Sequence, residues 1–289
     1  MNRKLLFGAF VLAAMYASAQ GNDLQIIEDD EAKTAMATYR VDKNGNRISN
    51  SYSGDVVIPD YSPRGYPVTT IHDNTFEGCK DLKSVKIGNK IKLIDKWAFY
   101  GCKSMVEVTI PASVDSIAEG AFSAMEALKK VTIADGTTIL RFDYGEMYGG
   151  RGMFGYNQQT ALETAYVGRN FKSPAGLFRG NESLTTVFVG KNISQLHEQD
   201  FAYCDKLTTI YAMPTTPPVC AANTFDGVDK EACTVFASQS SLNAYKQADV
   251  WKEFFNIALT PTSIQAITNE GIASERATWY TTDGRRLNA

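Results

Sequence analysis

Histidine and metal-binding cysteine patterns are scarce in this chain. Only two histidines, His72 and His197, occur in 289 residues, and none of the five cysteines forms a C-x2-C pair. Imidazole and thiolate are the main ligands of protein-bound zinc, and imidazole is also the commonest acid–base group at neutral pH. The sequence therefore predicts no metal site and no cofactor.

Neither positive nor negative charge dominates the sequence. The chain has 29 Lys and Arg residues against 32 Asp and Glu residues, for a net charge of -3. A nucleic-acid-binding protein would need a basic face, so we predict no nucleic-acid partner. Apolar residues make up 44% and charged residues 21%, which indicates a folded chain with a core rather than a disordered one.

Long apolar runs are confined to the start of the chain. Residues 1–19 combine Arg3 and Lys4 with an apolar stretch and end in Ala-Ser-Ala, which is typical of a cleaved secretory signal. A retained anchor helix is the alternative. No later stretch is apolar enough to span a membrane. We expect a mature chain that starts at Gln20, has no transmembrane span and is secreted or held at the cell surface.

The chain contains an internal repeat. Phenylalanine recurs at steps of 23, 23, 32, 24, 23 and 24 residues, at Phe76, Phe99, Phe122, Phe154, Phe178, Phe201 and Phe225. In six units an apolar residue lies six positions after the Phe, or eight positions after it in the case of Leu162. Two more residues of the pattern lie three and five positions after that apolar residue, as Val85 and Ile87 do after Leu82. This alternation is typical of a strand with one inward face. Such units bury their apolar faces by stacking, so the repeat predicts a solenoid.

The unit that begins at Ala98 reads A-F-Y-G-C-K-S-M-V-E-V-T-I-P and resembles the BspA-like leucine-rich repeat. The resemblance extends over residues 56–257. It implies an α/β, mostly β, fold: a right-handed leucine-rich-repeat solenoid of about six coils, each of 23–24 residues. It also implies an exported bacterial surface protein that binds partners, with host-cell or matrix adhesion known for some members, and it implies no catalytic residues.

Both ends of a solenoid need caps, because the terminal coils would otherwise expose core and strand edges. We expect a flexible N-terminus over 20–33, a β cap over 34–71, repeats over 72–236, a cap helix over 237–259 and a tail over 260–289. Leu242, Tyr245, Ala248 and Trp251 recur at helical spacing, and Ser240 or Ser241 can cap that helix. The tail resembles the start of a small C-terminal β segment that is cut short at Ala289.

The longest repeat step carries an insert over 143–156, which includes G-R-G-M-F-G at 150–155. This matches G-x-G-x-x-G, but the repeat register provides neither the preceding strand nor the long following helix of a dinucleotide site. One interpretation is a plain surface loop. The other is a loop that contacts a partner through Arg151, Met153 and Tyr156, since repeat insertions often map to a binding face.

The cysteines fall into two groups. Cys79, Cys102 and Cys204 each lie three residues after a repeat Phe, a slot that we expect to face the core, where a free thiol behaves as a small hydrophobe. Cys220 and Cys233 lie outside this slot, and export to an oxidising compartment makes a disulfide between them one interpretation. His72 and His197 hold equivalent positions five coils apart, about 24 Å, so they cannot share a site.

Outward strand positions are the candidate binding residues. Between the two inward strand residues, one column of the repeat runs Lys86, Thr109, Thr132, Tyr166, Phe188 and Tyr211, beside Ser84, Glu107, Lys130, Thr164, Thr186 and Thr209. Aromatic rings that face solvent are a common mark of an interface. We predict a partner site at Tyr166, Phe188 and Tyr211, with Thr164, Thr186 and Thr209 as its polar rim. The alternatives are that a cap or the tail covers the rings, or that the ladder only stabilises the sheet.

These observations favour a non-catalytic binding protein, secreted or displayed on a cell. Its partner would be a host extracellular or neighbouring-cell protein, or a glycan, recognised by a monomer through the concave solenoid face. A structural spacer that carries other surface modules is one alternative. A carbohydrate-active solenoid enzyme is another, but the sequence offers no catalytic carboxylate pair.

Overall fold

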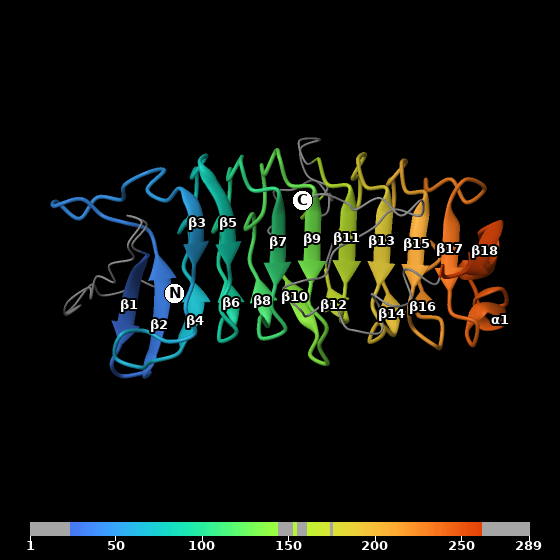
Figure 1. The fold of residues 1–289 in the computed structure, drawn as a ribbon, viewed down its shortest axis with the longest axis horizontal. Coiled ribbons are helices and arrows are strands. Elements are labelled where there is room, and N and C mark those ends of the chain that lie inside the picture. The colour runs from blue at the N-terminus through green and yellow to red at the C-terminus, as the bar shows by residue number, and fades with distance from the viewer. Residues whose placement is uncertain (1–23, 144–152, 155–160, 174–175, 262–289) are drawn as a thin grey trace, which may run out of the picture.

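A computed structural model describes residues 24–143, 153–154, 161–173 and 176–261. The residues expected to form the signal peptide, 1–19, lie outside these ranges, as does most of the tail. The described chain is mostly β and winds into a solenoid of parallel strands with about eight turns, which stack along the long axis of the molecule (Figure 1). No helix within the described ranges has the length and apolar character needed to cross a membrane.

Two seven-stranded sheets run along the solenoid. Sheet 1 is parallel and consists, in chain order, of β7 (Glu107–Ile110), β9 (Lys130–Ile133), β11 (Thr164–Val167), β13 (Thr186–Val189), β15 (Thr209–Ala212), β17 (Thr234–Ala237) and β18 (Asn256–Leu259). Sheet 2 consists of β1 (Gln25–Asp29), β2 (Thr34–Thr38), β4 (Val68–Ile71), β6 (Leu93–Ile94), β8 (Ser116–Ile117), β10 (Leu140–Phe142) and β12 (Phe171–Lys172). Two strand pairs, β3 (Gly54–Val57) with β5 (Leu82–Lys86) and β14 (Gln195–Leu196) with β16 (Val219–Cys220), complete the described strands.

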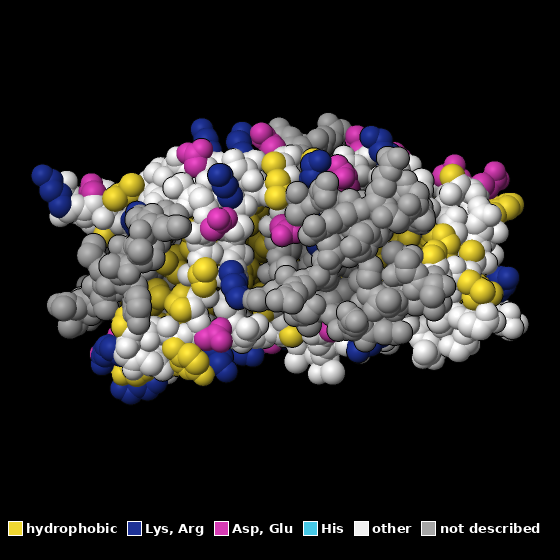
Figure 2. Space-filling view, viewed as in Figure 1, with side chains coloured by type: hydrophobic (Ala, Val, Ile, Leu, Met, Phe, Trp, Pro, Cys, Tyr) yellow, Lys and Arg dark blue, Asp and Glu magenta, His cyan; other side chains and the backbone are white. Residues whose placement is uncertain are grey.

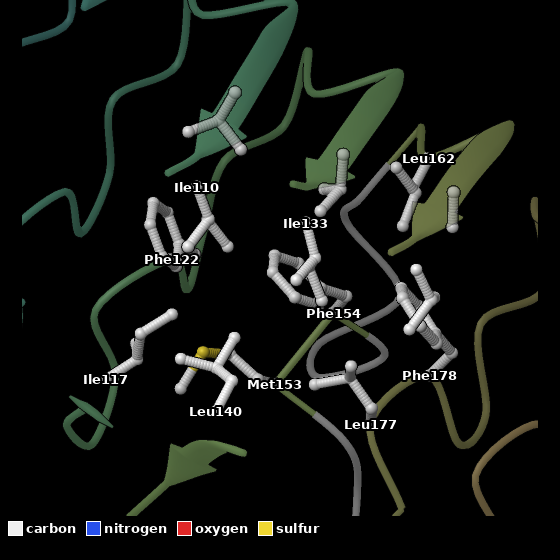
Figure 3. Packing of buried hydrophobic residues seen from close by; sticks show 14 of the residues in the cluster. Ile110, Ile117, Phe122, Ile133, Leu140, Met153, Phe154, Leu162, Leu177 and Phe178 are labelled. Carbon is white, nitrogen blue, oxygen red and sulfur yellow. The ribbon is translucent and has the colours of Figure 1, made fainter. Parts of the chain in front are cut away.

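The repeat phenylalanines form one continuous stack through the core. From Phe76 to Phe225, successive ring centroids lie 5.0–5.8 Å apart and the rings are close to parallel. The inward strand residues and the following apolar residues pack around them, as Figure 3 shows for Phe122, Phe154 and Phe178. All seven rings are at most 1% exposed. The predicted inward columns are therefore confirmed.

Aromatic residues of other types extend this stack at both ends. The Tyr52 ring lies 5.1 Å from Phe76, and Phe225 meets the rings of Trp251 at 5.5 Å and Phe254 at 5.3 Å. The recurring phenylalanines predict about six coils. The structure has about eight turns, because a tyrosine holds the inward place before Phe76 and a coil with strand β17 follows Phe225.

Most coils turn through left-handed backbone positions two residues before the Phe, two residues after it, or both. Those before it are Asn74, Trp97, Gly120, Gly176 and Gln199, and those after it are Gly78, Gly101, Ala124, Gly180, Tyr203 and Gly227. A positive φ is costly for residues with a Cβ, which explains the glycine that recurs two positions after the Phe.

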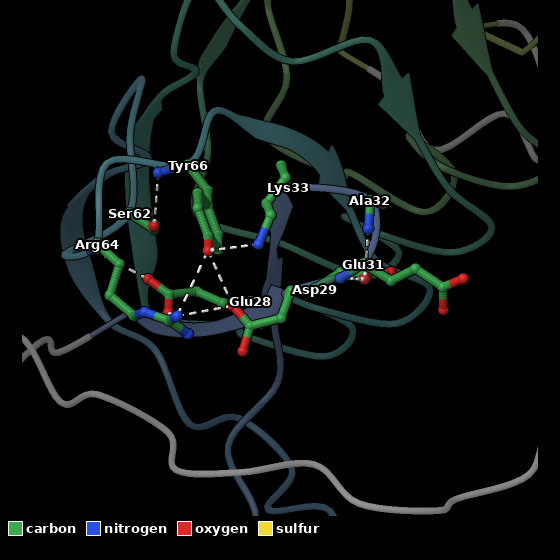
Figure 4. A network of polar contacts seen from close by, with 9 residues as sticks. Glu28, Asp29, Glu31, Ala32, Lys33, Ser62, Arg64 and Tyr66 are labelled. Atoms are coloured by element: carbon green, nitrogen blue, oxygen red, sulfur yellow. Dashed lines mark hydrogen bonds and ion pairs between the residues drawn. The ribbon is translucent and has the colours of Figure 1, made fainter.

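The N-terminal segment differs from its predicted form. Residues 25–29, within the stretch expected to be flexible, form β1, which pairs antiparallel with β2 because Leu24 and Ile26 have apolar side chains to bury. A surface network ties the β1–β2 turn to the loop before β4 (Figure 4). In it, the Arg64 guanidinium lies 2.7 Å from the Asp30 carboxylate, and the Tyr66 hydroxyl donates to the same oxygen at 2.9 Å.

The predicted cap helix over 237–259 is wrong in extent. The structure has one helical turn, α1 (Leu242–Tyr245), then a short 3₁₀ turn (Trp251–Glu253) and then β18, which pairs with β17. Ser241 precedes α1 without a side-chain capping bond. The spaced aromatic residues are fixed separately rather than along one helical stripe: the Tyr245 hydroxyl donates to the Pro214 carbonyl and the Trp251 indole to the Pro218 carbonyl. Val250, with φ of 68°, interrupts the helical backbone between them.

Candidate interaction face

Sheet 1 aligns aromatic side chains on its outward face. Parallel pairing places Tyr166 beside Phe188, Phe188 beside Tyr211 and Tyr211 beside Phe236. Neighbouring ring centroids lie 6.5, 4.6 and 5.2 Å apart along this series. We call these four residues the aromatic row. Sequence comparison of the units identified the first three members, and Phe236 belongs to the coil that it missed.

The aromatic row forms an apolar cluster separate from the core. Tyr166, Phe188 and Tyr211 are 2%, 2% and 4% exposed, with Met213 and Phe236 partly buried against them. The expectation that these rings face solvent is therefore wrong. Strand alternation determines which side of the sheet a residue occupies, but it does not determine what lies over that side. Figure 2 shows hydrophobic side chains gathered over β15 and β17, next to this cluster.

Tyr166 also has a polar anchor. Its hydroxyl donates a 2.8 Å hydrogen bond to Asp135 Oδ1, which belongs to the preceding coil. Burial, followed by the bond to this carboxylate and its negative charge, raises the pKa of the Tyr166 phenol well above its usual range. The phenol therefore stays neutral and fixed in orientation, so it acts as a positioned hydrogen-bond donor rather than as an acid or base.

The predicted polar rim lies directly beside the rings. Thr164, Thr186 and Thr209 pair in register across β11, β13 and β15, and each is half-buried. We call them the threonine row. Thr234 extends this row on β17. The structure thus brings together the six residues predicted as a site, in two parallel rows. Of these six residues, only the three threonines are partly accessible to solvent.

Ion pairs connect adjacent coils at the surface. Lys130 lies 3.7 Å from Glu107, Lys92 lies 3.6 Å from Asp115 and Lys96 lies 3.5 Å from Glu119. In each pair the two residues are 23 positions apart in the sequence, so a search for opposite charges at the repeat spacing would have found them. Acidic and basic side chains are correspondingly interspersed on the face in Figure 2. Exposed pairs of this kind contribute roughly 0–1 kcal/mol each.

The other predicted contact residues are not assembled into a site. Of the insert, Met153 is 3% exposed and belongs to the core cluster, so it is not a loop contact. The neighbouring Phe154 side chain is fixed in the phenylalanine stack, which draws Met153 inward. Arg151 and Tyr156 lie outside the described residues.

The predicted disulfide is not formed. Cys220 and Cys233 are both free thiols. Cys220 lies on β16, in the short pair with β14, whereas Cys233 lies just before β17 of sheet 1 and is fully buried, so the two are on different walls of the coil. Burial raises the pKa of each thiol to about 12.

The repeated cysteine slot faces the core as predicted, and it also carries a polar contact. Cys79, Cys102 and Cys204 are at most 1% exposed. The Cys102 and Cys204 thiols each donate to the carbonyl of the repeat Phe in the preceding coil at 3.2 Å, and Asn181 donates from the same slot to the Phe154 carbonyl at 2.6 Å. The slot therefore combines small volume with a hydrogen-bond donor between coils.

The histidines are separate, as expected. The His72 ring pairs with Asp73 beside Tyr39, and the His197 ring lies 5.8 Å from Phe171 and 3.6 Å from Asp200. In the part of the chain that the structure describes, no three His, Cys, Asp or Glu side chains gather in a way that could hold a metal ion.

Comparison with protein families finds the BspA type Leucine rich repeat region in six copies, at residues 62–143 and 158–247, which is more than half of the chain. Among solved structures, a leucine-rich repeat protein of T. pallidum (TpLRR) is 16% identical, with 82% of this chain and 92% of that chain covered and a TM-score of 0.48. One from Bacteroides ovatus is 14% identical, with coverage of 85% and 77% and a TM-score of 0.39.

The pneumococcal vaccine antigen PcpA is 12% identical, with coverage of 86% and 99% and a TM-score of 0.27. These TM-scores are all below 0.5, so membership of the leucine-rich-repeat family rests on the match to the family model. No curated protein matches the chain.

Proposed function

Because the chain belongs to the BspA-type leucine-rich-repeat family, we propose that it is an exported, non-catalytic protein that binds a partner through the outward face of sheet 1. The partner class is a host extracellular or neighbouring-cell protein, with a glycan as the second ligand class. Export would follow from the signal-like residues 1–19. The proposed contact residues are those of the threonine row, which lies beside the buried aromatic row.

The observation that carries this proposal is an apolar cluster that the solenoid core does not require. Rings inside the coils already form a continuous stack, and the aromatic row is a second stack on the opposite side of the same strands. In the same outward column, Lys86 and Thr109 are exposed, so polar residues are compatible with the fold there. Preformed, rigid rows of this kind lose little conformational entropy when they bind.

The threonine row offers the accessible part of this face. Its hydroxyl groups lie on three adjacent strands, at a spacing of about 4.8 Å. Such a regular series matches hydrogen-bond groups repeated along an extended peptide or a glycan chain. Half-burial holds the side chains in place while leaving one side of each open to solvent.

The test measures binding of the secreted chain to immobilised fibronectin, fibrinogen and a glycan panel by surface plasmon resonance. One variant carries Thr186→Lys and Thr209→Lys, because Lys130 already occupies the same column. The matched control is Tyr203→Asn, which changes a 47% exposed ring on a turn away from sheet 1 and keeps a residue that tolerates the left-handed backbone there. We expect saturable binding that falls at least about tenfold in the double variant and stays unchanged in the control.

Circular dichroism spectra identical to the parent would establish that the variants fold. Binding that is equal in all three proteins would refute the threonine row as the contact. Absence of binding to every probe would contradict a partner of the proposed classes and favour the spacer function.

A further inference from the structure

Cys79 and Cys102 occupy the same slot in two adjacent coils. Each lies three residues after a repeat Phe, and the two Phe rings stack with centroids 5.0 Å apart. The turns that carry the cysteines are also bonded to each other, because the Gly78 N–H donates to the Tyr100 carbonyl at 2.7 Å. Coils that stack at the strand spacing place equivalent Cα atoms about 4.8 Å apart, which lies within the range of about 4.4–6.8 Å that a disulfide requires.

The Cys102 thiol points toward the coil of its neighbour. Its Sγ donates to the Phe76 carbonyl at 3.2 Å, and the Cys79 N–H donates to the same oxygen at 3.0 Å. Because both groups contact one oxygen atom, the Cys102 sulfur lies beside the Cys79 backbone. Cys204 holds the same slot in a later coil, but the slots before and after it hold Asn181 and Val228. Cysteine therefore fills two consecutive slots only at Cys79 and Cys102.

The two thiols differ in their surroundings. Burial raises the pKa of both, and it raises that of Cys102 well above its usual range. At Cys79 the backbone N–H of Tyr52 and the positive charge of Arg47 oppose the rise in pKa. The thiolate is the reactive form of cysteine, and it forms more readily at Cys79.

The segment 47–54 lies against the turn that carries Cys79. The Lys80 N–H donates to Asn50 Oδ1 at 2.9 Å, and the Gly54 N–H donates to the Asp81 carbonyl at 2.8 Å. Cys79 itself is 1% exposed. A reagent in solution therefore meets this thiol during folding or while the segment is locally open. The structure describes the reduced form, in which both thiols are free.

We propose that Cys79 and Cys102 form a dithiol site that a low-molecular-weight disulfide oxidises to one disulfide between the two coils. The Cys79 thiolate attacks one sulfur of the oxidant, which forms a mixed disulfide and releases the other sulfur as a thiolate that takes up a proton. The Cys102 thiolate then attacks Cys79 Sγ, closes the bond between the coils and releases the second thiol. Two protein thiols are oxidised and one oxidant disulfide is reduced to two thiols. This chemistry does not depend on the proposed partner binding.

The first test follows pairing during folding. The reduced full chain is unfolded in urea and refolded by dilution with oxidised glutathione, and its disulfides are mapped by mass spectrometry without reduction. We expect the Cys79–Cys102 link in at least about tenfold excess over every link to Cys204. Cys204 is the internal control, because it is equally buried in the same slot without a cysteine in the slot of either neighbouring coil. Links spread evenly over the cysteines, or no Cys79–Cys102 link, would overturn the proposal.

The second test determines which thiol reacts first. Asn181 holds the same slot and donates to a carbonyl of the preceding coil, so Cys102→Asn and Cys79→Asn each keep a small donor in place. In the folded Cys102→Asn protein, glutathione should add to Cys79 at least about tenfold faster than to Cys102 in the folded Cys79→Asn protein. Equal rates, or faster addition to Cys102, would rule out Cys79 as the first nucleophile.

The third test uses the parent sequence alone and so needs no variant to fold. Oxidised and reduced forms are unfolded in urea and followed by circular dichroism. The bridge closes a loop over residues 79–102, so the equilibrium constant for unfolding should fall by roughly a hundredfold on oxidation. An oxidised form that unfolds as readily as the reduced form would mean that the bridge strains the coils, and it would overturn a site that the fold accommodates.

Discussion

Arg169 is a buried cation that connects coils two apart. Its side chain is 0% exposed and leaves the end of β11. One guanidinium nitrogen donates to the Ala112 carbonyl at 3.0 Å and the Thr138 hydroxyl at 2.9 Å, and the other donates to the Pro111 and Val114 carbonyls at 3.2 and 2.7 Å. Burial lowers the pKa of Arg169, opposed by the charge of Asp115. No carboxylate hydrogen bond accompanies these four contacts among the described residues, so carbonyl dipoles hold the charge.

Replacement by methionine keeps most of the stem and removes the charged donors. Each buried acceptor that loses its donor costs about 1–3 kcal/mol, while removal of the guanidinium regains part of its desolvation cost. We expect Arg169→Met to lower the free energy of unfolding by about 3 kcal/mol. Arg169→Lys should cost nearly as much, because one ammonium group cannot reach two pairs of acceptors.

The assay is urea unfolding of the full chain, followed by circular dichroism and tryptophan fluorescence so that a two-state transition can be checked. Arg141→Met, at an exposed position on β10, is the matched control and should change stability by less than about 0.5 kcal/mol. An Arg169→Met protein as stable as the parent would refute the argument. It would mean that the desolvation cost of the cation equals everything its hydrogen bonds contribute.

Other predictions concern the turns and the thiols. Gly180 has φ of 74° and nothing within 4 Å of an added Cβ, so Gly180→Ala should cost about 1–2 kcal/mol from backbone strain alone. Ala124→Gly at the equivalent turn should not destabilise; a thermal melt that ranks these two variants the other way would contradict the turn assignment. Native Cys220 and Cys233 should resist iodoacetamide at pH 8, whereas all five thiols should react after unfolding without reductant. Thiols that react only after reduction would contradict their free state. Because the pKa of both thiols is raised from 9.0 to about 12, the unfolded chain loses these protons first. Stability in urea should therefore be unaffected by these thiols below pH 9 and should fall between pH 9 and 12, less steeply in a Cys220→Ala, Cys233→Ala variant.

The sequence was most informative where one residue type must recur. A phenylalanine that stacks on its copy in the next coil has little freedom in size or position, so its spacing revealed the solenoid. Tyr52 lies 24 residues before Phe76 and fills the same place, but its hydroxyl donates to the Thr38 carbonyl at 2.7 Å. A polar atom that finds a local partner can enter the stack, and a search for one residue type misses it.

The sequence was less informative where structure depends on what packs from outside. Periodicity placed Tyr166, Phe188 and Tyr211 on the outward face correctly, but it could not show that they pack into a cluster with Met213 and Phe236 and are 2–4% exposed. Tyr245 and Trp251 have helical spacing, yet each is fixed by a different proline carbonyl. For Cys220 and Cys233, separation in the sequence could not show that they lie on different walls of the coil.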